Sequence, residues 1–216
     1  MQEINDQLKN KLDTTFNILL ELEYMKNGII DVSNEKSKYF QKSSQKSQFL
    51  HTSFKAFSKL FTIEIYKLLD KNGDYNLLKT IGFCKQNLGK INWHNKIDFQ
   101  TLEKLEQKLN YPDETLSTIK TLRDKFYAHS DKNRFSYNLQ IDKEELWKIL
   151  DNLQDVFRIL CSHYNNTCWI FKIQYKGTPE LRSLSNYSDL RKFVMQSKID
   201  GENHISIEEL EKIIRN

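Results

Sequence analysis

Two residues of the stretch Leu122–Phe135, LRDKFYAHSDKNRF, have side chains that could do chemistry together. Arg123 is always charged and donates hydrogen bonds in a fixed fork, which suits a phosphate group. His129 titrates near neutral pH, so it can accept or donate a proton. Acting on a phosphodiester, Arg123 would hold the phosphate and neutralise charge in the transition state, while His129 would move the proton.

The helix that must position these residues has an apolar face. At about 100° per residue, Arg123 falls inside the apolar arc and His129 falls at its edge. The arc consists of Leu116, Ile119, Leu122 and Phe126. A charge on a packed face is costly unless it is paired or left open to a ligand. Two interpretations are therefore open: Arg123 pairs with a carboxylate of a neighbouring helix while His129 caps its own helix beside Asp131, or both residues act on a phosphodiester.

The remainder of the chain is expected to be all-α. Only 2 prolines and 6 glycines interrupt 216 residues, and apolar residues recur at helical spacing almost throughout. The expected helices cover about residues 3–26, 50–68, 75–87, 99–109 and 146–160, and a further helix begins at Pro112 and carries Arg123 and His129. Asn27-Gly28 is expected to stop the first helix, and the stripe from Leu50 to Leu68 is expected to be aromatic core.

Capping residues set the expected starts of the later helices. Asp74 and Asp98 are the predicted N-caps of the third and fourth, and Pro112 opens the helix that carries the motif. Asp142 and Glu145 have the spacing of a capping box before the long last bundle helix.

The C-terminal part differs in character. Residues 169–175 alternate in a way that predicts a short strand or an extended segment, and two short helices are expected at about 187–196 and 207–214. The chain is therefore predicted to consist of a helical bundle at residues 1–165 and a C-terminal appendage at 166–216 packed on it.

Composition and motifs exclude several classes of protein. The net charge is +4, no apolar run reaches the roughly 20 residues that span a bilayer, and the three cysteines form no pair at metal-binding spacing. We therefore expect a cytoplasmic protein with reduced cysteines that serve as ordinary packing residues. No metal site or cofactor is predicted: residues 198–209 have Lys198 and Asn203 where a calcium loop needs a ligand and a glycine, and the remaining histidines lie apart.

A basic segment lies between Asn34 and Lys59, where Glu35 is the only acidic residue. It is either a solvated helix face with a polar connection or a surface that binds a polyanion. Its positive residues are Lys36, Lys38, Lys42, Lys46, Lys55 and Lys59.

The motif resembles one known family. Arg123 and His129, with five residues between them and a polar residue directly after the arginine, resemble the R-x4-6-H motif of the HEPN superfamily (higher eukaryotes and prokaryotes nucleotide-binding). The strings Leu122–Lys125 and Ala128–Lys132 are similar to its abortive-infection U-type branch, as are Leu68-Leu69-Asp70 and Asn76-Leu77-Leu78.

The resemblance implies a HEPN-like bundle and a metal-independent endoribonuclease of antiphage defence or toxin–antitoxin systems. It implies that Arg123 and His129 meet their copies at a homodimer interface, where the ribose 2′-hydroxyl attacks. Asp124 would orient Arg123, and Asp131 would orient His129. RNA is the expected partner, with an antitoxin or another defence protein as a further one. Contacts to RNA are expected from Lys125, Tyr127, Lys132, Arg134, Lys42 and Lys46.

Two rivals belong to other classes. The first is a non-catalytic helical scaffold or module that binds a protein partner or a nucleotide, with Arg123 as an ion-pair anchor. The second is a non-specific RNA-binding protein whose affinity depends strongly on salt and not on His129. A tyrosine that accepts a nucleotide in some HEPN toxins would stand two residues after the histidine, where this chain has Asp131, so that form of control is not expected.

Overall fold

The computed structural model describes residues 2–34, 48–124 and 141–171, together with 190–191, 193–196, 206 and 208. Its main helices are α1 (Gln2–Asn34), α3 (Gln48–Leu69), α4 (Leu77–Gln86), α5 (Phe99–Lys108), α6 (Asp113–Thr121) and α7 (Lys143–Asn165). No strand occurs among the described residues, so the prediction of an all-α fold is confirmed there.

The chain divides into two compact units. The first comprises Met1–Lys26 and Lys59–Ile173, and the second comprises Asn27–Ser58 and Gln174–Asn216. The first unit holds most of the described helices and the arginine of the motif. The boundary expected at residue 165 remains a prediction.

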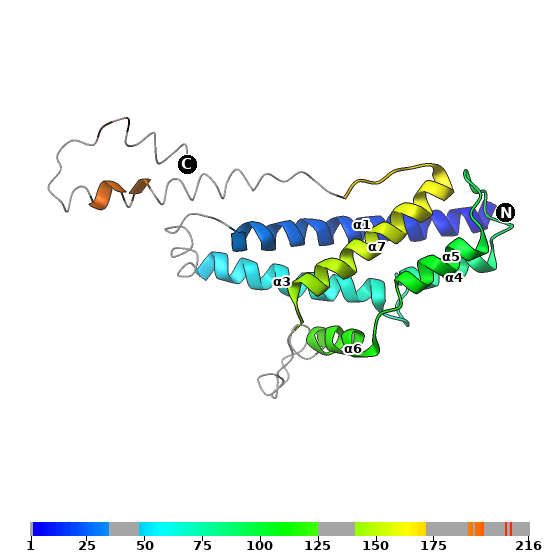
Figure 1. The fold of residues 1–216 in the computed structure, drawn as a ribbon, viewed down its shortest axis with the longest axis horizontal. Coiled ribbons are helices and arrows are strands. Elements are labelled where there is room, and N and C mark those ends of the chain that lie inside the picture. The colour runs from blue at the N-terminus through cyan, green and yellow to red at the C-terminus, as the bar shows by residue number, and fades with distance from the viewer. Residues whose placement is uncertain are drawn as a thin grey trace. The chain divides into compact units, whose positions relative to one another are not determined.

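The core of the first unit lies where α1, α3 and α7 meet (Figure 1). Helical spacing predicts one inward apolar face for each of α1, α5 and α7, and these faces are confirmed by the burial of Leu8, Leu12, Leu19 and Leu22, of Leu102, Leu105 and Leu109, and of Leu146, Ile149, Leu150, Leu153, Val156, Phe157 and Leu160. Phe16 of α1 stacks on Phe157 of α7, and Phe61 of α3 meets Trp147 of α7 edge to face. One buried polar pair also joins two helices: Gln154 donates to the Glu23 carboxylate at 2.9 Å.

Helix α1 is longer than expected. Asn27-Gly28 does not end it, and helical backbone continues to Asn34. Within the second unit, the ring of Phe57 lies 3.4 Å from where a Cβ of Gly28 would be. A Cβ at that distance would make an ordinary van der Waals contact, so the ring does not demand a glycine there, and the helix continues through Gly28 despite the local stop signal.

The apolar stripe of α3 is core over only part of its length. Phe61, Ile65 and Leu68 are buried, as predicted, whereas Phe57 is 37% exposed and Phe54 is half-buried. The expectation that the whole stripe is aromatic core is therefore wrong at Phe57.

Two of the predicted helix starts need correction. The cap of α4 is Asn76, whose side chain accepts hydrogen bonds from the backbone N–H groups of Leu78 and Lys79, so the prediction of Asp74 is wrong. At α7, Asp142 caps the helix as expected by accepting from the Glu144 N–H. The side chain of Glu145 instead accepts from the Thr115 hydroxyl of α6 at 2.8 Å. Asp98 caps α5 as predicted.

After α7 the chain leaves the helix through Asn166, which has a left-handed backbone with φ 57°. Residues 166–171 belong to no helix or strand, so no strand is seen over the described part of the predicted segment, but Ile170 is exposed and Phe171 is buried, as the alternation predicts. Trp169 and Phe171 both contact Phe16 of α1. Residues 172–175 lie outside the described residues. Residues 190–191 and 193–196 are helical where the backbone is described, in agreement with a helix at about 187–196.

Candidate functional site

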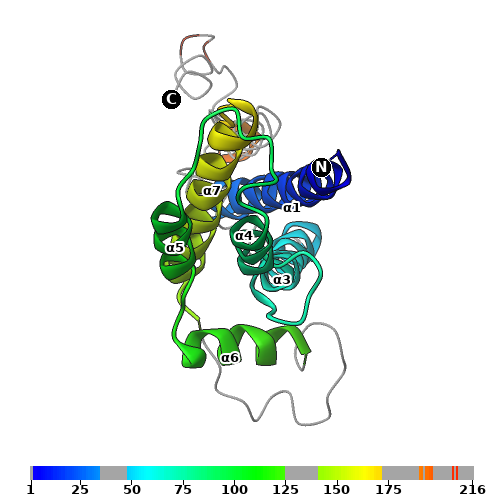
Figure 2. The same cartoon turned by 90° about the vertical axis from the view of Figure 1, so that its right-hand side faces the viewer.

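Helix α6 ends two residues before the arginine of the motif, and Figure 2 shows this helix running crosswise below the other helices. Pro112 precedes it and two acidic residues, Asp113 and Glu114, occupy its first turn, where they complement the helix dipole. Its inward residues Ile119 and Leu122 are 0% and 6% exposed. Burial of these two side chains fixes the end of α6 against the bundle.

The backbone changes geometry at the motif itself. The α-helix ends at Thr121, and Leu122, Arg123 and Asp124 form a wider turn of the π-helical kind. Such turns are rare and occur frequently at functional sites.

Arg123 is held by three side chains. Its Nε and Nη2 atoms both lie 2.6 Å from Oδ1 of Asp124. Its Nη1 lies 3.8 Å from Oδ2 of Asp70, directly after the end of α3. Its Cζ lies 4.0 Å from the centre of the Tyr66 ring, within the range of a cation–π interaction. The Arg123 side chain is 26% exposed, so it is partly buried and still accessible to solvent.

The Asp70 carboxylate is itself fixed by the turn that follows α3. Its Oδ1 accepts from the Asn72 N–H at 3.0 Å, and its carbonyl accepts from the Gly73 N–H at 2.9 Å. A Cβ at Gly73 would lie only 3.3 Å from the Cβ and carbonyl oxygen of Asp70. The turn thus leaves Oδ2 of Asp70 directed at Arg123. The guanidinium also lies near the carboxyl end of α3, where the helix dipole favours a cation.

Tyr66 forms the apolar side of this cluster and is 7% exposed. Burial raises the pKa of its phenol; the nearby Asp70 adds to the rise, Arg123 opposes it, and Asp124 adds to it again. The phenol is therefore neutral at physiological pH. The ring presents a π face to Arg123 without adding a charge.

The charges of the described cluster do not balance. Two carboxylates, Asp70 and Asp124, face one guanidinium. An anionic phosphate that approaches Arg123 would meet this excess negative charge, so a productive phosphate site needs further cations or a displaced carboxylate. This is the main electrostatic constraint on any function assigned to Arg123.

Of the predicted site residues, the structure describes Arg123 and Asp124 and brings them into direct contact. The other predicted catalytic residues, His129 and Asp131, lie outside the described residues. So do the residues expected to contact RNA, which are Lys125, Tyr127, Lys132, Arg134, Lys42 and Lys46.

Sequence reasoning missed Tyr66 as a site residue. Its position four residues before Asp70 places both on the same face of α3, but nothing in the spacing distinguishes Tyr66 from an ordinary core tyrosine. Asp70 appeared only as part of the family-like string Leu68-Leu69-Asp70, without a role. The contact with Arg123 is what identifies both.

The described residues contain no group of three or more metal-ligating side chains, and none of the described helices combines the length and apolarity of a membrane span. Cys84 and Cys161 are buried, and burial raises the pKa of each thiol to about 12, which suits packing and not nucleophilic chemistry. Cys168 is exposed, so the expectation that all three cysteines are packing residues is wrong for it.

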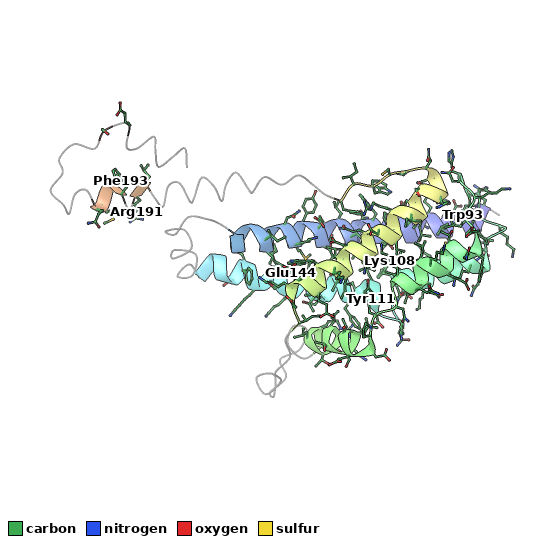
Figure 3. All side chains as sticks on the ribbon, viewed as in Figure 1. Trp93, Lys108, Tyr111, Glu144, Arg191 and Phe193 are labelled. Carbon is green, nitrogen blue, oxygen red and sulfur yellow. The ribbon has the colours of Figure 1, made fainter. Side chains whose placement is uncertain are left out.

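Two open pockets lie elsewhere in the first unit. The larger, about 610 Å³, lies where the end of α5 meets the start of α7, and Figure 3 labels Lys108, Tyr111 and Glu144 on its wall. The other, about 410 Å³, lies between α1, α7 and Trp169. Arg123 lines neither of them, so neither pocket belongs to the motif.

An all-α bundle with this motif at the end of α6 agrees with the HEPN class of helical domains. The family model of AbiU2, a HEPN family, matches residues 1–183, and the chain belongs to this family. The match extends past residue 165, into the segment expected to lie outside the bundle. No curated protein and no solved structure matches the chain.

Proposed function

We propose that this chain is a metal-independent endoribonuclease of the HEPN type that acts in antiphage defence or as a toxin. Membership of an abortive-infection HEPN family supports the biological setting. The observation that supports phosphodiester chemistry is the environment of Arg123. Its guanidinium contacts Tyr66, Asp70 and Asp124, and its side chain is still 26% exposed. An arginine preorganised in this way can bind the charge that develops on a phosphate.

The proposed reaction is an internal transesterification of RNA. The ribose 2′-oxygen attacks the adjacent phosphorus, the bond from phosphorus to the 5′-oxygen breaks, and the products are a 2′,3′-cyclic phosphate and a 5′-hydroxyl. His129 takes the proton of the 2′-hydroxyl or supplies one to the leaving oxygen, and Asp131 orients its ring. Arg123 neutralises the phosphoryl oxygens, and no step requires a metal ion.

The excess negative charge around Arg123 favours a composite site. Two copies of the motif related by a two-fold axis would add the second copy's Arg123 and His129 to one groove. Lys125, Lys132 and Arg134, close to the motif in sequence, would supply further positive charge for the RNA backbone. We therefore propose a homodimer as the active form.

The test is cleavage of single-stranded RNA by purified protein in EDTA, with the ends of the products identified. We expect cyclic-phosphate ends from the wild type and no cleavage by His129→Ala, with both proteins equally folded by circular dichroism. Expression of the two forms should show toxicity for the wild type only. Cleavage by His129→Ala that persists in EDTA would contradict the proposal.

One observation favours a second candidate, a non-catalytic helical module for a protein partner. The charge of Arg123 is already met by Asp124 and Asp70, as an ion-pair anchor requires. In that case substitution of Arg123 affects stability and partner binding, and no cleavage is seen in any variant.

A further inference from the structure

Arg123 contacts Tyr66, Asp70 and Asp124, but not all three contacts can fix the guanidinium relative to the bundle. Asp124 is the next residue along the chain, so it moves with Arg123 and restricts the rotamer without setting the position of the guanidinium. The contacts that reach another element of the fold are those with Tyr66 and Asp70, both at the carboxyl end of α3. These two residues connect the motif to the core.

Of these two contacts, that with Tyr66 is the better buried, because Tyr66 is only 7% exposed. The ring centre lies 4.0 Å from the guanidinium carbon, whereas the charged atoms of Arg123 and Asp70 lie 3.8 Å apart at a site where both side chains remain about a quarter exposed. A buried ring cannot be displaced by solvent or salt as a partly exposed carboxylate can. The Tyr66 ring therefore fixes the face of the guanidinium that packs on it, and Asp70 orients the Nη1 atom of Arg123.

We propose that Tyr66 is a positioning residue of the ribonuclease site, with Asp70, directly after α3, as its weaker companion; this inference rests on the proposed function. Tyr66 holds one face of the guanidinium, whose edges contact Asp124 and Asp70, so a phosphoryl oxygen would have to take the place of one of these carboxylates. It contributes to the chemical step by keeping Arg123 in place and has no contact with the reacting atoms. A misplacement of about 1 Å in such a site can cost on the order of 100-fold in rate.

The aromatic ring, not the hydroxyl, is the part of Tyr66 that this role requires. Tyr66→Phe keeps the ring face and should retain kcat within about twofold, because the cation–π attraction comes from the ring. Tyr66→Leu keeps apolar bulk but has no π face, and its kcat should fall roughly 10- to 100-fold with a smaller change in KM. A purely structural role would give an enzyme of normal kcat in its folded fraction.

The experiment is steady-state cleavage, in EDTA, of a fluorescent single-stranded RNA that the wild type cuts. The fraction of folded protein is measured by circular dichroism for each variant. Tyr164→Leu is the matched control, because Tyr164 is a part-buried tyrosine that donates to the Asn5 carbonyl and does not contact Arg123. It should keep the wild-type kcat.

Asp70→Asn provides a second arm that does not depend on the folding of Tyr66→Leu. It removes the charge facing Nη1 at nearly constant volume, on a side chain that is 27% exposed. We expect kcat to fall about 3- to 10-fold, which is less than for Tyr66→Leu because a partly exposed ion pair is weaker.

The possible outcomes separate the two proposals. If the wild type cleaves RNA and both Tyr66→Leu and Asp70→Asn keep its kcat, the positioning role is wrong and the ribonuclease proposal stands. If Tyr66→Phe loses as much as Tyr66→Leu, the ring-face argument is wrong. If the wild type itself cleaves no RNA, the proposed function fails, and the inference fails with it before any variant is made.

Discussion

At the scale of single residues, Arg123 is the side chain whose placement both functional interpretations must explain. It occupies a partly buried position, its neighbours are an aromatic ring and two carboxylates, and it is the only positive member of the described cluster. A guanidinium lost from such a setting leaves Asp70 and Asp124 without their partner. Removal should therefore cost stability whether or not the site is catalytic.

We expect Arg123→Ala to lower the free energy of unfolding by about 1–3 kcal/mol, since charged hydrogen bonds are lost from a partly exposed site. Urea denaturation measures this change. Arg158→Ala is the matched control: Arg158 pairs with Asp155 on the surface with 46% of its side chain exposed, and its loss should cost less than about 1 kcal/mol.

Activity then distinguishes the two candidate functions. Under the ribonuclease proposal, folded Arg123→Ala cleaves no RNA, and Arg158→Ala cleaves normally. If Arg123→Ala is destabilised but cleaves at the wild-type rate, the arginine is an anchor only.

At the scale of elements, the starts of helices show where local sequence signals compete. Asp74 and Asn76 both lie before α4, and both are good N-cap residues. Asn76 is the cap because its side chain, only 1% exposed, reaches two backbone N–H groups of α4. Asp74 is exposed. Tertiary burial selects between two residues that are locally equivalent.

Asn76→Ala should therefore lower the free energy of unfolding by about 1 kcal/mol, because two N–H groups of α4 lose their acceptor. Asp74→Ala should change it by less than about 0.5 kcal/mol, as for other surface substitutions. Thermal or urea denaturation of the pair measures the difference. Equal losses in the two variants would contradict the assignment of the cap.

At the scale of the whole molecule, several buried groups have to remain protonated in the folded state. Burial raises the pKa of the Cys84 and Cys161 thiols from the ordinary value of 9.0 to about 12. Burial also raises the pKa of the Tyr111 phenol to about 12. When the pH exceeds 9.0 the thiols of the unfolded chain ionise, whereas the buried thiols keep their protons. The unfolded state then binds fewer protons, so stability falls with rising pH.

The free energy of unfolding should thus be nearly constant up to about pH 8.5 and then decline by about 1.4 kcal/mol per pH unit for each buried thiol. Urea denaturation at a series of alkaline pH values measures the slope. Cys84→Ala should lower the slope, and Cys168→Ala, which alters an exposed thiol, should not. A stability that is flat to pH 11 would show that the buried thiols ionise as easily in the folded protein as in the unfolded one.

Helical spacing predicted the fold well because the bundle rests on local periodicity. The inward faces of α1, α5 and α7, and the caps Asp98 and Asp142, follow from residue types and spacing alone. The failures have different causes. The bond from Thr115 to Glu145 joins two helices, at α4 two good N-cap residues compete close together in the sequence, and α1 continues through Gly28.

The site was predictable to a smaller extent. Residue types identified Arg123, and its need for a partner followed from the apolar face on which it lies. They could not identify Tyr66, because an aromatic residue on an apolar stripe is usually core and the contact joins residues 57 positions apart. They also could not anticipate the π-helical turn at residues 122–124.

Gly73 has a consequence for how natural variants of this family should be judged. It lies fifty residues before the arginine of the motif, yet a Cβ there would lie 3.3 Å from the Cβ and carbonyl oxygen of Asp70, so the turn that holds the carboxylate facing Arg123 would have to give by a few tenths of an ångström. A variant with alanine at this position would retain every residue of the R-x5-H string and still have an altered site. Inspection of the motif alone would therefore score such a protein as intact.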